Sequence, residues 1–244
     1  MTPELARLAI SLVDLTNLDE RCSDADIDAL CARAAEHGTA AVCVWPDFVR
    51  RSAAALAGTG VGVATVVNFP TGDERPYAVG AVAGCAVDDG ATEIDVVLPY
   101  RAFLAGDTAW VLDVLRTARV ASTGAHLKVI LETGELPDTE AIAEAARLAI
   151  ESGADFVKTS TGKIPVSATL DAAATMLDVI AQTAPVGGHR VGLKPSGGIR
   201  TADQAADYLT LAAGVMGDAY LAPATFRFGA SSLLDALIDV TTGV

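Results

Sequence analysis

A lysine at the end of an apolar run is the first residue that could carry out chemistry. In "ADFVKTSTGK", residues 154–163, Lys158 follows Phe156 and Val157 and precedes a short polar turn. Burying an unpaired ammonium group costs several kcal/mol unless the group is paired or gives up its proton. We therefore predict that Lys158 either forms an ion pair or acts as a nucleophilic amine.

A second lysine occupies the matching position in the next part of the chain. Lys194 lies in "VGLKPSGG", and a glycine turn follows it just as one follows Lys158. Two ammonium groups close together in a cavity of low dielectric repel, so one of them loses its proton more easily. The resulting free amine can attack a carbonyl group and form a Schiff base. The pair thus predicts covalent catalysis without a metal or a cofactor.

Other charged residues also interrupt apolar runs. Asp95 in "EIDVV" alternates in phase with Glu93, and a carboxylate there could stabilise one ammonium group and move protons. Lys128 is a rival nucleophile, but its following glycine is more distant, so we place it deeper, as a partner for Asp95 or Glu132. For any single one of these residues, a buried ion pair without chemistry is the alternative.

Loops rich in glycine and serine suggest a phosphate site. The stretches "KPSGGIR" and "RFGASSLL" carry paired glycines or serines, and Thr201 with Gln204 predicts a capping box at the start of a helix. Ser232 precedes another helix, with Asp235 in the matching position. Gly162, Lys163 and Arg200 add further donors. Each loop alone is compatible with an ordinary turn, whereas three neighbouring loops favour phosphate binding.

The elements that must position these residues repeat along the chain. Alanine-rich segments of helical period separate short β-branched runs, and this alternation predicts parallel strands joined by right-handed crossovers. Eight candidate strands are present: "SLVDLT", "AAVCVWP", "GVATVVNFP", "TEIDVVLPY", "LKVILETG", "FVKTSTG", "VGLKPSGG" and "FRFGAS".

The spacing of these runs decides between two architectures. One residue from each run lies roughly 23 to 36 residues from the next, which is the length of one strand-plus-helix unit. An open doubly wound sheet would carry a glycine-rich turn after its first strand, where this chain has "DLTNLD". We therefore predict an α/β fold, a single (β/α)8 TIM barrel over residues 1–244, with the polar residues at its mouth.

Composition restricts the partners. The 244 residues include 31 acidic and 17 basic residues, for a net charge of −14, and no basic run. Nucleic acid and anionic membrane surfaces are therefore not expected partners. An anionic substrate would have to be held by a local group of donors.

The cysteines and the N-terminus indicate a cytoplasmic protein. Four cysteines without a C-x-x-C pair, together with three histidines, suggest neither a zinc ribbon nor a disulfide framework. The N-terminal "MTPELARLAISLVDL" lacks the features of a secretion signal, and glycines interrupt the uncharged stretch of residues 52–72, so no membrane span is expected. The alanine-rich helices are compatible with a homodimer.

Several motifs together resemble one enzyme family. "DLTNL", "NFPTG", "EIDVVLPYRA", "LKVILETGEL", "GADFVKTSTGK", "GLKPSGGIRT" and "RFGASSLL" resemble the class I 2-deoxy-D-ribose-5-phosphate aldolases from Leu12 to Leu234. The resemblance implies reversible cleavage of 2-deoxy-D-ribose 5-phosphate into acetaldehyde and D-glyceraldehyde 3-phosphate, in deoxynucleoside catabolism. No cofactor or metal is implied.

The resemblance also implies roles for individual residues. Lys158 would form the Schiff base, with Asp95 and Lys194 as the proton donor and acceptor pair. The residues implied to hold the 5-phosphate are Gly162, Lys163, Gly197, Gly198, Arg200, Gly229, Ser231 and Ser232. Those implied to line the substrate pocket are Asp14, Thr16, Cys43 and Thr161.

One departure and two alternatives accompany the resemblance. Several members of the family end in a mobile tail with a tyrosine that helps to move a proton at the enamine carbon. This sequence ends in "DVTTGV" and its last tyrosine is Tyr220, so water or Asp95 is expected to serve that step. The alternatives are a non-covalent phosphosugar isomerase or decarboxylase, which would give no adduct on Lys158, and an inactive protein that binds sugar phosphates.

Overall fold

Each of the eight apolar runs forms one strand. The computed structural model describes residues 1–183 and 190–243. Its strands are β1 (Val13–Thr16), β2 (Ala41–Val44), β3 (Gly62–Val67), β4 (Glu93–Val97), β5 (His126–Ile130), β6 (Phe156–Lys158), β7 (Gly192–Lys194) and β8 (Phe228–Ala230). All pairs of neighbouring strands in the sheet are parallel. The eight strand predictions are confirmed.

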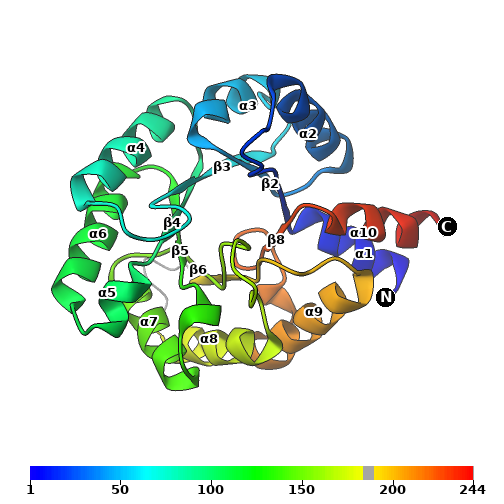
Figure 1. Cartoon of the computed structure of the whole chain (residues 1–244). Helices are drawn as coiled ribbons and strands as arrows, with labels where there is room; N and C mark the ends of the chain where they lie inside the picture. Colours follow the sequence, from blue (N-terminus) through cyan, green and yellow to red (C-terminus); the bar gives the residue numbers. More distant parts are fainter. Residues whose placement is uncertain (184–189, 244) are drawn as a thin grey trace.

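The sheet curls until its edges meet. The strand order is β7-β6-β5-β4-β3-β2-β1-β8, and bridges from Leu193 to Phe226 and from Ser196 to Gly229 link β7 to β8. The Arg227 N–H also donates to the Leu193 carbonyl at 3.0 Å. A ring of helices surrounds the strands (Figure 1), so the predicted (β/α)8 barrel is confirmed.

The helices occupy the alanine-rich segments. They are α1 (Pro3–Ser11), α2 (Asp24–His37), α3 (Val49–Ala55), α4 (Pro76–Asp88), α5 (Tyr100–Leu104), α6 (Thr108–Ala121), α7 (Thr139–Glu151), α8 (Leu170–Gln182), α9 (Ala202–Met216) and α10 (Leu233–Thr242), with short 3-10 turns η1 (Pro46–Phe48), η2 (Thr133–Glu135) and η3 (Asp218–Tyr220). Helices α1 and α10 pack together, so the two ends of the described chain lie near each other (Figure 1). Val244, the last residue of "DVTTGV", lies outside the described residues.

The two predicted caps have different outcomes. Thr201 and Gln204 form a capping box at the start of α9, as expected. Ser232 makes no side-chain cap at α10, and the Asp235 carboxylate instead binds Arg33 on α2. The second prediction is wrong because Ser232 has φ and ψ angles of −113° and −7°, whereas a capping residue has an extended backbone.

Alternation along the strands separates two environments. Ile94 and Val96 are fully buried in the main hydrophobic core, whereas Asp95 between them pairs with lysine side chains of other strands. A smaller apolar cluster of Leu18, Cys43, Ala64 and Val66 forms a separate core, against which Trp45 and Phe69 pack. The interior is thus polar around Asp95 and apolar around Cys43.

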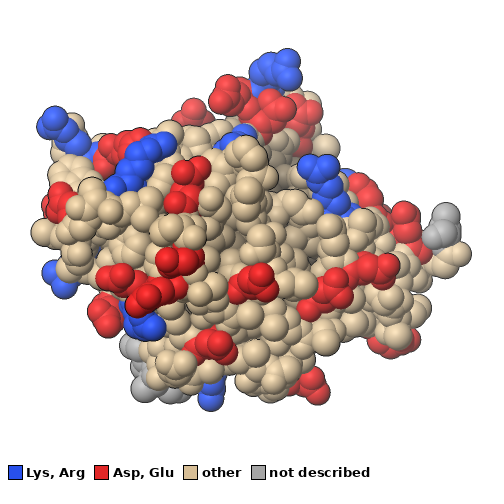
Figure 2. Space-filling view, turned by 60° about the horizontal axis from the view of Figure 1, so that its bottom comes forward, with Lys and Arg blue, Asp and Glu red and all other residues tan. Residues whose placement is uncertain are grey.

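The exterior carries most of the acidic residues. Figure 2 shows carboxylates spread over one face of the molecule, with fewer lysine and arginine side chains among them. No helix in residues 1–183 and 190–243 is long and apolar enough to cross a membrane.

Candidate active site

The strand register brings the two predicted lysines to one level. Lys158 on β6 lies directly opposite Lys194 on β7. Lys128 on β5 is opposite Asp95 on β4, while Lys158 is opposite Ile130, two residues further along β5. Lys128 therefore lies deeper in the barrel than Lys158, as predicted.

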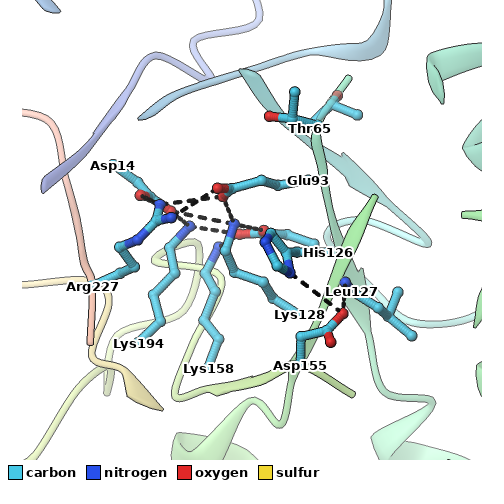
Figure 3. A network of polar contacts seen from close by, with 12 residues as sticks. Asp14, Thr65, Glu93, His126, Leu127, Lys128, Asp155, Lys158, Lys194 and Arg227 are labelled. Carbon is cyan, nitrogen blue, oxygen red and sulfur yellow. Dashed lines mark hydrogen bonds and ion pairs between the residues drawn. The ribbon is translucent and has the colours of Figure 1, made fainter. Parts of the chain in front are cut away.

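Asp95 joins all three lysines. Its Oδ2 atom lies 2.8 Å from Lys158 Nζ and 2.7 Å from Lys194 Nζ, and its Oδ1 atom accepts a hydrogen bond from Lys128 Nζ at 2.9 Å. Figure 3 shows the side chains of Lys128, Lys158 and Lys194 extending side by side into the ion network. Because Asp95 is fully buried, these contacts replace its hydration.

A second layer of charges lies against the first. Asp14 Oδ2 is 2.5 Å from Lys194 Nζ, and Asp14 Oδ1 accepts from Arg227 at 2.6 Å. Arg227 also donates to Glu93 Oε1 at 2.9 Å, and Glu93 binds Lys128. Sequence reasoning missed Arg227, although an arginine directly before the apolar Phe228 of "RFGAS" was a usable signal.

The charges of this network balance only if one lysine is neutral. Four basic side chains, Lys128, Lys158, Lys194 and Arg227, face three carboxylates, Asp14, Glu93 and Asp95. Buried networks disfavour an unbalanced charge. The lysine with the fewest carboxylate contacts is Lys158, which touches Asp95 alone among these three carboxylates.

The pKa directions agree with this count. Burial lowers the pKa of Lys158, and the neighbouring Lys194 ammonium lowers it further against the attraction of Asp95. Burial also acts on Lys194, but Asp14 and Asp95 together raise its pKa above the ordinary value. Burial would raise the pKa of Asp95, yet the three lysines hold it well below its usual range. The site therefore pairs a lysine whose pKa is lowered, Lys158, with a neighbouring lysine whose pKa is raised, Lys194.

A cavity of about 590 Å³ opens at the ends of β1, β6, β7 and β8. Its lining includes all eight residues predicted to hold phosphate, together with Thr16 and Thr161. Also lining it, and not singled out from the sequence, are Asn17, Leu18, Asp19, Leu30, Ser196, Ile199 and Ala230. Several of these adjoin quoted motifs such as "DLTNL" and "KPSGG", which was the available signal.

Glycine backbones connect the cavity to the lysines. Gly229 lines the cavity, and a Cβ atom there would come within 3.1 Å of Lys194 Cε. Gly197 has a φ of 89°, and a Cβ atom there would come within 2.6 Å of Ser167 Cβ. These positions need glycine, which lets the backbone approach a ligand closely.

Two residues expected in the pocket lie behind its surface. The Asp14 side chain is fully buried and contacts Lys194 and Arg227. Cys43 is fully buried in the apolar cluster with Leu18, and burial raises the pKa of its thiol. In the described residues, no group of three or more His, Cys, Asp or Glu side chains could hold a metal ion.

Glu132, which sequence reasoning offered as a partner for Lys128, lies elsewhere. Its carboxylate accepts hydrogen bonds from the Thr161 N–H at 3.1 Å and from Thr161 Oγ1 at 2.5 Å. The sequence suggested Asp95 or Glu132 as the partner of Lys128, and the structure pairs Lys128 with Asp95.

The chain is similar to aldolases in sequence and in structure. The family described as "DeoC/LacD family aldolase" matches residues 8–237. A deoxyribose-phosphate aldolase of Agrobacterium fabrum is 48% identical, covering 98% of this chain and 93% of the relative.

Two crystal structures share the fold. One from Coccidioides immitis, described provisionally as a deoxyribose-phosphate aldolase, is 32% identical with a TM-score of 0.86, covering 100% of this chain and 88% of that one. A deoxyribose phosphate aldolase of Aeropyrum pernix, described as a unique tetrameric structure, is 26% identical with a TM-score of 0.79, covering 100% and 94%.

Proposed function

The chain belongs to the DeoC/LacD family of aldolases, and we propose that it is a class I deoxyribose-phosphate aldolase. It reversibly cleaves 2-deoxy-D-ribose 5-phosphate to acetaldehyde and D-glyceraldehyde 3-phosphate, a reaction of deoxynucleoside catabolism. The single observation that carries the proposal is the position of the buried Lys158 amine. Its Nζ atom contacts Asp95 Oδ2 at 2.8 Å, and Lys194 Nζ contacts the same oxygen at 2.7 Å.

Lys158 is the nucleophile. Its free amine adds to the C1 aldehyde of the open-chain sugar, and loss of water gives an iminium ion. The iminium ion withdraws electrons, so removal of the proton from the C3 hydroxyl breaks the C2–C3 bond. D-glyceraldehyde 3-phosphate leaves, and an enamine of acetaldehyde stays on Lys158 until protonation and hydrolysis release it.

Asp95 and Lys194 move the protons. Asp95 Oδ2 contacts both Lys158 Nζ and Lys194 Nζ, so a proton can pass between the two amines through one carboxylate. The same pair can take the proton of the C3 hydroxyl, and Asp95 or a water molecule returns a proton to the enamine carbon.

The glycine and serine loops bind the 5-phosphate. Gly162, Lys163, Gly197, Gly198, Arg200, Gly229, Ser231 and Ser232 all line the cavity. Helix α10 begins at this cavity and Ser232 makes no side-chain cap there, so its first N–H groups are suited to an anion. Thr16 and Thr161 contact the sugar, while Asp14 and Cys43 act from behind the cavity surface.

The proposal extends to the assembly and the cellular location. We place the enzyme in the cytoplasm as a homodimer. The large apolar side chains of Tyr77 on α4 and Val120 on α6 are 72% and 75% exposed, which supports a contact between copies on this side of the barrel.

Borohydride reduction in the presence of acetaldehyde tests the covalent step. We expect one reduced adduct, mapped to Lys158 by peptide mass spectrometry, and none in a Lys158→Leu variant. A Lys128→Leu variant serves as the comparison. It should keep the adduct on Lys158, because Lys128 lies deeper on β5.

Three results would contradict the proposal. An adduct on Lys128 or Lys194 with Lys158 unmodified would assign the nucleophile elsewhere. Turnover of a phosphosugar without any adduct would favour the acid/base isomerase or decarboxylase. Sugar phosphate binding without turnover or adduct would identify a binding protein.

A further inference from the structure

Glu132 has a backbone conformation that glutamate rarely adopts. It follows β5 with only Leu131 between, and its φ and ψ of 54° and 57° lie in the left-handed region. Residues other than glycine, asparagine and aspartate seldom occupy this region, because Cβ crowds the backbone. Glu132 is also fully buried. Such a combination persists only where the surrounding contacts hold it.

The hydrogen bonds of the Glu132 side chain lead to one turn. Both carboxylate oxygens bind Thr161, one through its N–H at 3.1 Å and one through its hydroxyl at 2.5 Å. The Thr161 hydroxyl donates to Glu132 and accepts from the Lys163 N–H at 3.0 Å. The direction of this second bond is thus fixed by the first. Gly162 completes the turn with a φ of 77°.

The turn that Glu132 binds makes a contact across the cavity. Lys163 Nζ donates to the Leu18 carbonyl at 2.8 Å, in the loop after β1. Thr161, Gly162, Lys163 and Leu18 all line the cavity, whereas Glu132 does not. A chain of hydrogen bonds therefore runs from Glu132, behind the cavity wall, to the opposite side of the cavity.

We propose that Glu132 is a positioning residue that fixes the Thr161–Lys163 turn in the shape that binds the substrate phosphate. The proposal rests on the phosphate role given above to Gly162 and Lys163. Glu132 acts through Thr161 and touches neither the reacting carbons nor the phosphate. Its removal should weaken binding of the phosphate and leave the chemistry at Lys158 in place.

The test uses two variants of one contact. Glu132→Gln keeps the size of the side chain but can satisfy only one of the two Thr161 donors, and Thr161→Val removes the hydroxyl. We expect each to raise KM for 2-deoxy-D-ribose 5-phosphate about 10-fold or more, because each loses a hydrogen bond of a charged carboxylate. For Glu132→Gln, whose side chain lies outside the cavity lining, kcat should stay within about 3-fold, and adduct formation with acetaldehyde should be unchanged.

Controls separate this role from a general loss of structure. Thr161→Ser, which keeps the hydroxyl, should restore the wild-type KM. Glu135→Gln changes an exposed carboxylate three residues away and should have no effect. The double variant Glu132→Gln with Thr161→Val should lose no more than the worse single variant, because both remove one interaction.

A readout without turnover keeps the proposal separate from the aldolase assignment. Calorimetric titration with inorganic phosphate should show weaker binding in Glu132→Gln and Thr161→Val than in the wild type. Unchanged phosphate binding would overturn the positioning role, even if the wild type forms its adduct on Lys158. Equal losses for deoxyribose with and without phosphate would overturn it as well. Absence of the wild-type adduct would instead count against the aldolase assignment, and phosphate binding would still decide the role of Glu132.

Discussion

Three lysines share one buried carboxylate, yet their partners give them different properties. Lys128 contacts Asp14, Glu93 and Asp95, Lys194 contacts Asp14 and Asp95, and Lys158 contacts Asp95 alone among these carboxylates. The pKa values of Lys128 and Lys194 are raised by these carboxylates against the effect of burial, whereas burial and Lys194 lower that of Lys158. The number of counter-charges thus separates the pKa of Lys158 from those of Lys128 and Lys194.

Replacing Lys194 by methionine should raise the pKa of Lys158. At a separation of about 5 Å and an effective dielectric of about 20, repulsion between the two ammonium groups is about 3 kcal/mol, or about two pKa units. Loss of Lys194 also leaves Asp95 with fewer cations, which favours a protonated Lys158. The pH profile of adduct formation on Lys158 with acetaldehyde should therefore shift upward by about two units.

Lys163→Met is the matched control for this prediction. Lys163 is close in sequence, but its Nζ contacts the Leu18 carbonyl, and acetaldehyde carries no phosphate. Its pH profile should coincide with the wild-type profile. Superimposable profiles for Lys194→Met and the wild type would show that burial alone activates Lys158.

The loops after β6, β7 and β8 act together because the barrel sets them side by side. The Gly162 and Gly197 backbones come close enough that a Cβ atom at Gly197 would lie 3.1 Å from Gly162 Cα. Such contacts leave no room for side chains and bring backbone N–H groups to one surface. The proposed phosphate site is therefore a property of three loops.

A negative charge in the third loop should weaken binding of the phosphorylated substrate. Ser232→Asp would place a carboxylate at the cavity lining beside the dianion. We expect kcat/KM for 2-deoxy-D-ribose 5-phosphate to fall by about 10-fold or more, and far less for deoxyribose without phosphate.

Thr242→Asp provides the matched charge change at the other end of helix α10. This variant should leave both substrates nearly unaffected in steady-state kinetics. Equal losses on both substrates in Ser232→Asp would mean that this loop does not recognise the phosphate.

At the scale of the whole molecule, the ion network links distant strands across the interior of the barrel. Arg227, directly before β8, binds Asp14 on β1 and Glu93 on β4, residues 213 and 134 positions away. Its guanidinium group also lies over the Phe156 ring at 5.6 Å from the ring centre. The contact with Glu93 crosses the barrel, whereas Asp14 lies on the neighbouring strand β1.

Removing Arg227 should destabilise the fold. Arg227→Met removes one cation from the buried carboxylates Asp14 and Glu93, and breaking a buried pair in this way costs about 3–5 kcal/mol. Urea unfolding should show a loss of this size. Arg33→Met, which removes a partly exposed pair with Asp235, should cost less than about 1 kcal/mol. Equal losses for the two variants would show that the buried network adds no more than a surface pair.

The sequence by itself determined the strands, helices and loops of this protein. Strand period, helix period and loop composition are local properties, so eight strands, the barrel and the strand positions of Asp95, Lys158 and Lys194 could all be predicted. Parallel pairing then implied that the two lysines lie at one level, which the register confirms. The glycine and serine motifs likewise predicted the residues that line the cavity.

Only the tertiary structure decided which charges meet. Arg227 reaches Asp14 because β8 pairs with β1 in the sheet, and no local pattern records that contact. Asp14 and Cys43 lie behind the cavity surface, Asp235 binds Arg33, and Glu132 holds Thr161, each for the same reason. Ionic and hydrogen-bond partners depend on distances of a few ångströms between distant segments, and the closed barrel fixes those distances.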